Sequence, residues 1–166
     1  MKKIKLSNGV EMPQLGYGVY QVEPDECERC VVDALSVGYR MIDTAQAYLN
    51  EEAVGNAWKK SGISRDEIFL VSKVWHSNYG EGQTMKSIDE SLRKLQTDYI
   101  DLMLLHQPYC DRYGAYRDLE KAYKAGSNFA LGFLIGLSSI EKYSNCFRLT
   151  ITPRKGVKVI VVSKGI

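Results

Sequence analysis

The 166-residue chain has no long hydrophobic run, few cysteines and almost no excess charge. Its longest nearly apolar stretch, residues 129–137, is too short to cross a bilayer as a helix, which takes about 20 residues. Charged and apolar residues alternate at the start, where a signal peptide would need an unbroken apolar segment. Four cysteines do not suggest a secreted disulfide scaffold, and a net charge of +2 favours neither a nucleic-acid binder nor a polybasic membrane surface. We therefore expect a cytoplasmic globular protein without a nucleic-acid or membrane partner.

Short apolar segments and amphipathic helices alternate along most of the chain. The Asn8-Gly9 pair predicts a hairpin over residues 3–13. Apolar strands that alternate with helices are typical of βα units around a buried parallel sheet. We expect strands at 15–20, 40–43, 68–74 and 99–105, and helices at 24–37, 51–61, 84–95 and 115–125.

The pattern becomes irregular after residue 126. Residues 157–162 predict a strand, because five of the six are β-branched and apolar, whereas residues 127–156 fit no clean βα unit. We therefore expect one domain over residues 1–166. It should consist of an N-terminal hairpin, about four βα units and an irregular C-terminal segment.

Four ionisable residues lie at or just beyond the ends of the predicted strands. Asp43, Lys73 and His106 end successive strands, and Tyr48 lies in the loop that follows Asp43. Ligands of parallel α/β proteins bind at the carboxyl ends of the strands. Because such residues are costly in apolar strands unless they are paired, we interpret the four as a functional site.

The residue types suggest acid catalysis at a carbonyl group. A tyrosine has an ordinary pKa of about 10, and a nearby ammonium such as Lys73 is expected to lower the pKa of Tyr48. Asp43 can hold Lys73 charged, and His106 can donate a hydrogen bond to a substrate oxygen. The set lacks a serine or cysteine nucleophile beside a base, so acyl transfer is the less natural reaction.

The same residues carry a resemblance to the aldo-keto reductases, which covers residues 3–126. The segments 43–51, 72–75 and 98–108 resemble the family's motifs, as do the hairpin, residues 16–18 and residues 127–129. The resemblance implies a (β/α)8 TIM barrel and NADPH-dependent reduction of aldehydes or ketones to alcohols, with NADH as a possible alternative cofactor. It places the catalytic tetrad on Asp43, Tyr48, Lys73 and His106, with Tyr48 as the general acid. The bacterial aldehyde and keto-sugar reductases are the most similar members.

The resemblance also assigns contacts to cofactor and substrate. The substrate pocket is expected to be walled by Tyr20 and Trp75, with His76 close by, and no metal is expected. Besides Asp43, the residues expected to bind the cofactor are Gly18, Val19, Ser127, Asn128 and Lys164.

The chain departs from the family pattern in its last third. The fifth barrel strand is expected to be missing between Gly126 and Ser127. The chain after Phe129 is also too short for three further βα units, since a complete barrel takes about 250 residues. Residues 154–164 faintly resemble the eighth strand. We therefore expect only part of a barrel, truncated or internally deleted.

Two alternatives to the enzyme remain open. A complete barrel would be monomeric, but an open sheet has unpaired edges, so the chain could be a non-catalytic remnant that self-associates. Cys27 and Cys30 form a C-x-x-C pattern, but they fall inside a predicted helix, which makes a redox module the weaker alternative.

Overall fold

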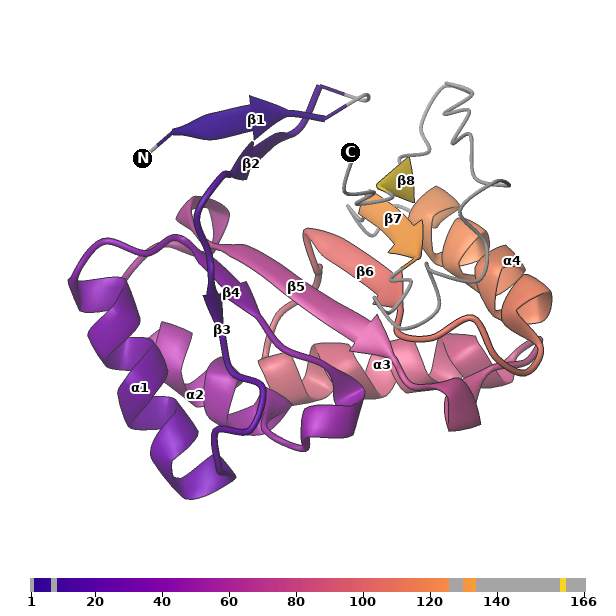
Figure 1. Ribbon diagram of the computed structural model, residues 1–166, viewed down its shortest axis with the longest axis horizontal. Coiled ribbons are helices and arrows are strands. Elements are labelled where there is room, and N and C mark those ends of the chain that lie inside the picture. Colours follow the sequence, from indigo (N-terminus) through magenta and orange to yellow (C-terminus); the bar gives the residue numbers. More distant parts are fainter. Residues whose placement is uncertain (1, 7–8, 126–129, 134–158, 161–166) are drawn as a thin grey trace, which may run out of the picture.

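The computed structural model describes residues 2–6, 9–125, 130–133 and 159–160 (Figure 1). Three short 3-10 helices, η1 (Gln46–Tyr48), η2 (Arg65–Glu67) and η3 (His76–Asn78), lie in its loops. The α-helices are α1 (Pro24–Ser36), α2 (Glu51–Lys60), α3 (Gln83–Leu95) and α4 (Arg112–Lys124). The strands are β1 (Lys3–Lys5), β2 (Glu11–Pro13), β3 (Tyr17–Gly18), β4 (Met41–Asp43), β5 (Phe69–Val74), β6 (Leu102–Leu105), β7 (Ala130–Phe133) and β8 (Val159–Ile160).

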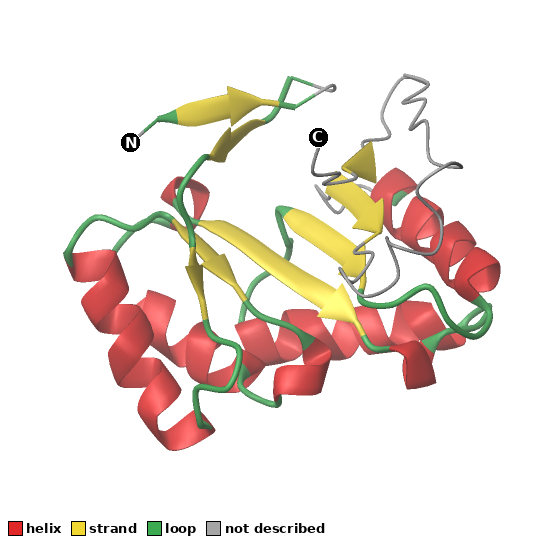
Figure 2. Ribbon diagram, in the orientation of Figure 1, coloured by secondary structure: helices red, strands yellow, loops and turns green. Residues whose placement is uncertain are grey.

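Strands β3 to β8 form one parallel sheet in sequence order, and the helices lie outside it. Each of the strands β3 to β6 is followed by an α-helix. Helix α1 packs on α2, α2 on α3, and α3 on α4. The antiparallel hairpin β1–β2 lies on the other side of the strands, near the start of β3 (Figures 1 and 2). This arrangement is part of a (β/α)8 barrel, as the sequence predicts. None of the described helices is long and apolar enough to cross a membrane.

The two faces of the sheet are buried in different ways. Leu70 and Met103 point outward into the main core beneath the helices. Phe69, Val71 and Leu104 lie in a smaller cluster on the inner face, which the hairpin approaches through Met12. Side chains alternate between faces along a strand. Position 73 on β5 therefore faces inward, in line with the inner cluster.

The last third of the described chain corrects two expectations. The fifth place in the sheet is filled, because β7 pairs with β6 in parallel, and Leu102 lies opposite Ala130. The expectation of a missing fifth strand is therefore wrong. Strand β8 lies within the predicted strand 157–162 but pairs with β7 as the sixth strand of the sheet, so its assignment as an eighth strand is not supported.

Gly55 allows α2 to pack closely against α3. A Cβ atom at this position would clash with the Lys94 carbonyl oxygen and lie 2.9 Å from the Leu95 carbonyl carbon. Because both atoms belong to the backbone, neither can move cheaply. We expect Gly55→Ala to lower the free energy of unfolding by about 1–3 kcal/mol, even though alanine favours helices.

Urea denaturation would test this expectation, with Glu52→Ala on the exposed side of the same helix as the matched control. The control is expected to change the free energy of unfolding by less than about 0.5 kcal/mol. Equal stability of the two variants would contradict the close packing.

Candidate active site

The structure brings Asp43, Tyr48, Lys73 and His106 to one end of the parallel sheet. Asp43 is the last residue of β4, and Lys73 is the last but one of β5. His106 directly follows β6, where its backbone N–H donates to the Val74 carbonyl at 3.0 Å. Tyr48 ends the 3-10 helix η1 in the loop after β4. The three strand ends and one loop therefore meet as the sequence predicts.

Lys73 and Asp43 form an ion pair at the base of the site. The Lys73 Nζ donates to Asp43 Oδ1 at 2.5 Å and to the Thr44 carbonyl at 2.8 Å. The lysine side chain is 4% exposed, whereas the aspartate side chain is 38% exposed. Burial lowers the pKa of Lys73, and the neighbouring Asp43 carboxylate opposes that shift. The ammonium is therefore fixed in place, while its carboxylate partner reaches solvent.

The Tyr48 ring lies against the ammonium and two other aromatic rings. Its centroid is 5.0 Å from Lys73 Nζ, 5.0 Å from the Tyr20 ring and 5.6 Å from the His106 ring. Burial, supported by the charge of Asp43 and by Tyr20, raises the pKa of Tyr48 to about 12. The expectation that this pKa is lowered is therefore wrong for the free protein, because burial raises it and Asp43 and Tyr20 raise it further. Tyr48 keeps its proton at neutral pH.

His106 is held neutral. Burial is the main reason that its pKa falls to about 4, and the Lys73 charge adds to the effect. A neutral imidazole has one N–H donor and one acceptor nitrogen. Within the part of the chain that the structure describes, the buried Nδ1 of His106 has no hydrogen-bond partner. The ring can therefore serve a substrate oxygen as a neutral hydrogen-bond donor.

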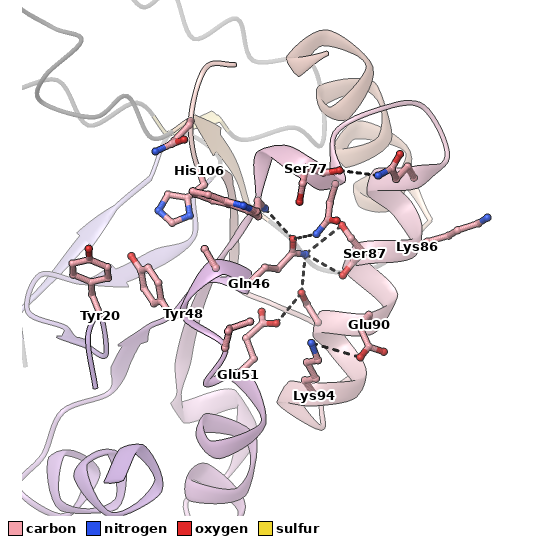
Figure 3. A pocket seen from close by; sticks show the side chains of 17 residues that line it. Tyr20, Gln46, Tyr48, Glu51, Ser77, Lys86, Ser87, Glu90, Lys94 and His106 are labelled. Carbon is pink, nitrogen blue, oxygen red and sulfur yellow. Dashed lines mark hydrogen bonds and ion pairs between the residues drawn. The ribbon is translucent and has the colours of Figure 1, made fainter. Parts of the chain in front are cut away.

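The residues expected to wall the substrate pocket lie around the same rings. Trp75 packs edge-on against His106 at 5.1 Å between ring centroids, and His76 lies 4.3 Å from Trp75. Tyr20 is 64% exposed at the mouth of the pocket. The pocket has a volume of about 1090 Å³ and extends from Tyr20, Tyr48 and His106 to the surface of α3 (Figure 3).

The expected cofactor contacts are described only in part. Gly18 is exposed and lies opposite Asp43 in the sheet, and a Cβ atom on it would lie 4.0 Å from Asp43 Oδ2. The glycine therefore leaves the carboxylate uncovered. Val19 is fully buried, so it can offer only backbone atoms, and its N–H already donates to the Asp43 carbonyl at 3.0 Å. The remaining expected contacts lie outside the described residues: Ser127, Asn128 and Lys164.

Sequence reasoning missed two amides that hold the loops of the site together. Asn50 is buried, and its Oδ1 accepts a hydrogen bond from Thr44 Oγ1 at 2.8 Å. Its Nδ2 donates to the carbonyls of Val19 and Val22 at 2.9 and 3.0 Å. Asn50 therefore joins the loop after β3 to the loop after β4. The second amide, Gln46, is described below. Both lie inside the motif 43–51, where polar residues between apolar ones were a signal for buried hydrogen bonds.

The structure offers little support for redox chemistry at the C-x-x-C pattern. Cys27 and Cys30 are both free thiols within α1. Cys27 is buried, and burial raises the pKa of its thiol to about 11, which suppresses the reactive thiolate. Among the described residues, no group of three or more histidine, cysteine, aspartate or glutamate side chains could hold a metal ion.

The low pKa of His106 predicts a pH-dependent stability. In the unfolded chain the imidazole titrates near its ordinary value of 6.5, whereas in the folded chain it titrates near 4. The unfolded chain therefore binds more protons between these values. The contribution of His106 to the free energy of unfolding is complete above pH 6.5 and is lost as the pH falls towards 4. We expect His106→Asn to make the free energy of unfolding less dependent on pH in this window. Urea denaturation over the same range would measure it, and equal slopes in both proteins would contradict the prediction.

Comparison with known proteins identifies many relatives of one family. A model of the Aldo/keto reductase family matches residues 5–162. A glyoxal reductase of Bacillus subtilis is 48% identical over 131 residues, which are 78% of this chain and 48% of that protein. A methylglyoxal reductase of Yersinia pestis is 48% identical over 119 residues, which are 70% of this chain and 42% of that protein. The chain thus spans about half the length of these curated relatives.

Solved structures agree with the fold. The crystal structure of an aldo/keto reductase from Brucella melitensis superimposes with a TM-score of 0.76 at 41% identity. That match covers 85% of this chain and 57% of the other. The described sheet and helices therefore correspond to a little over half of that structure.

Proposed function

Because the chain belongs to the aldo/keto reductase family, we propose that it is an oxidoreductase that reduces aldehydes or ketones to alcohols with NADPH. The observation that carries the proposal is the cluster of a protonated phenol, a buried ammonium and a neutral imidazole at one end of the sheet. Tyr48, Lys73 and His106 supply these groups, and Asp43 pairs with the ammonium. Three ionisable side chains with perturbed pKa values, clustered at one end of a sheet, are more typical of a catalytic site than of a simple binding site.

Each residue has a distinct part in the proposed chemistry. When the carbonyl carbon is reduced, negative charge develops on its oxygen, and Tyr48 donates its proton to that oxygen. A phenol with a raised pKa is a poor acid towards water, but the alkoxide that develops on the substrate is a stronger base than the phenolate and takes the proton. The Lys73 ammonium, 5.0 Å from the ring centroid, stabilises the phenolate that remains. His106, being neutral, donates a hydrogen bond to the same oxygen without competing as an acid.

We place the nicotinamide end of the cofactor at the exposed edge of this cluster, where Gly18 and Asp43 would hold it. Gly18 and Asp43 lie side by side there, and the missing side chain of Gly18 leaves room for a flat ring beside the carboxylate. The Nδ1 of His106, which has no partner among the described residues, also marks a place that an added polar group could complete. When bound, NADPH supplies the hydride. We propose that the chain uses NADPH rather than NADH. Further contacts to the cofactor are proposed for Ser127, Asn128 and Lys164.

Small aldehydes are the proposed substrates. Two relatives carry the names glyoxal reductase and methylglyoxal reductase. The pocket near Tyr48 is bounded by the rings of Tyr20, Trp75 and His106, which favours a compact carbonyl compound that stacks on aromatic surfaces. We propose that the protein acts in the cytoplasm on substrates that diffuse freely.

A reductase assay on the purified 166-residue chain tests the proposal. The assay should include glyoxal, methylglyoxal and an aromatic aldehyde, each with NADPH and with NADH. We expect turnover with NADPH and saturable quenching of protein fluorescence when the cofactor binds. A chain that binds neither cofactor and elutes as an oligomer from a sizing column would instead be the non-catalytic remnant.

A further inference from the structure

Gln46 occupies the middle of the pocket, between the ring cluster and helix α3. In Figure 3 it lies between Tyr48 and His106 on one side and Ser87 on the other, and dashed lines reach from it towards its neighbours. It is the first residue of the 3-10 helix η1, which ends at Tyr48. Any contact that its side chain makes therefore acts on the segment that carries the proposed acid.

The Gln46 side chain uses both ends of its amide. Its Oε1 accepts from the Trp75 backbone N–H and from Asn78 Nδ2, both at 2.9 Å. Its Nε2 donates to the Ser87 carbonyl at 3.1 Å and to the Ser91 hydroxyl at 3.0 Å. One side chain thus joins three segments of the chain: η1, the loop after β5 and the middle of α3.

The bond to Trp75 has the clearest consequence for the site. Trp75 is the residue at which the chain leaves β5, and its ring packs against His106. The Tyr48 ring also lies close to His106, from the opposite loop. Tyr48 and Trp75 therefore lie on two sides of His106, and the hydrogen bond from Trp75 to Gln46 ties the loops that carry them together.

From this arrangement we infer that Gln46 is a positioning residue, which sets the opening between Tyr48 and the Trp75 wall and thereby selects compact carbonyl substrates. The part of the inference that concerns substrates rests on the proposed function. The part that concerns the position of the Trp75 loop does not. Gln46 touches the reacting groups only through the backbone and the neighbouring loops. Its removal should therefore change the fit of the substrate more than the proton transfer itself.

The two tryptophans of the chain make the geometry measurable without turnover. In a Trp58→Phe background, Trp75 becomes the only indole, so its emission and its quenching by acrylamide report on this loop. Gln46→Ala is expected to shift the emission to the red and to increase quenching. Gln46→Glu keeps the acceptor for the Trp75 N–H and is expected to retain the starting spectrum, as is Gln14→Ala, which changes an exposed glutamine outside the pocket.

The same variants have an expected kinetic signature. Gln46→Ala should raise KM for methylglyoxal about tenfold, with a smaller change in kcat, and should reduce the preference for methylglyoxal over an aromatic aldehyde. Gln46→Glu should restore most of that preference. If Gln46→Ala does not fold, Gln46→Met replaces it, because methionine keeps the length of the side chain without either hydrogen bond.

The outcomes separate this inference from the proposed function. An unchanged Trp75 signal in Gln46→Ala, or equal signals in Gln46→Met and Gln46→Glu, would overturn the role of Gln46 even if the chain is an active reductase. Absence of any turnover would overturn the proposed function, while the fluorescence comparison would still decide whether Gln46 positions the Trp75 loop.

Discussion

Replacing Tyr48 by phenylalanine is expected to lower kcat for aldehyde reduction by about 10²–10⁴-fold, the usual contribution of a general acid. Phenylalanine keeps the ring contacts with Tyr20 and His106 but has no proton to give. Because the lost hydroxyl acts on the substrate oxygen, the affinity for NADPH should stay unchanged. Steady-state kinetics and a fluorescence titration with NADPH would measure the two quantities separately.

A second tyrosine variant provides the control for that experiment. Tyr113 is 65% exposed on α4, outside the pocket, so Tyr113→Phe should retain the kcat of the starting protein. If Tyr48→Phe reduces aldehydes as fast as Tyr113→Phe, then Tyr48 is not the acid. If Tyr48→Phe loses NADPH binding as well, the hydroxyl would belong to the cofactor site instead.

Lys73→Met is the second change with a large expected effect. Methionine fills the space of the buried side chain, but the ammonium beside Tyr48 is lost, together with its bonds to Asp43 and Thr44. Removal of one preorganised electrostatic group from an active site lowers kcat by about 10²–10³-fold. Because the Asp43 side chain is 38% exposed, water can solvate its carboxylate, so we expect the variant to fold.

The same variant makes a prediction about His106 that needs no substrate. The Lys73 charge contributes to the low pKa of His106, so the pKa of His106 should rise in Lys73→Met. Burial remains, and the pKa should therefore stay below its ordinary value of 6.5. The chain has two histidines, so an NMR titration of their ring protons can follow both, with a His76→Gln variant for assignment. An unchanged titration of His106 would contradict the electrostatic coupling within the cluster.

Local sequence signals predicted the helices better than the strands. Helices α1, α2 and α3 have ends within one residue of the expected ranges, because amphipathic spacing is a local signal and a glycine follows α1 and α2. Strand β6 starts three residues later than expected. Arg65 binds the Tyr99 carbonyl and the Asp101 carboxylate, so these residues form a loop before the strand. Local sequence signals could not predict this contact, because Arg65 lies more than thirty positions earlier. Helix α4 begins early because the Asp111 carboxylate caps the Gly114 N–H.

The last third of the chain was predictable only in part. Nothing in the composition of residues 130–133 distinguishes a barrel strand from an irregular apolar segment. Their place became visible only through pairing with β6, which is a long-range contact. The strand at Val159–Ile160 had a stronger local signal, since β-branched residues dominate that segment, but its neighbour in the sheet could not be read from the sequence.

Site positions could be predicted more securely than their electrostatics. Strand ends that meet at one edge of a parallel sheet follow from topology, so Asp43, Lys73 and His106 were expected together. The predicted direction of the shift in the Tyr48 pKa was wrong, because that shift depends on how deeply the Tyr48 ring is buried in the folded chain. Gln46 escaped notice because its partners on α3 lie about forty residues away.

Transfer of a labelled hydride tests the central claim most directly. The purified chain would be mixed with methylglyoxal and NADPH that carries deuterium at both positions on C4 of the nicotinamide, and the alcohol would be analysed by mass spectrometry. We predict one deuterium on the former carbonyl carbon with the starting protein and essentially no labelled alcohol with Tyr48→Phe. No labelled alcohol from the starting protein, or equal amounts from both, would contradict a reductase in which Tyr48 provides the proton.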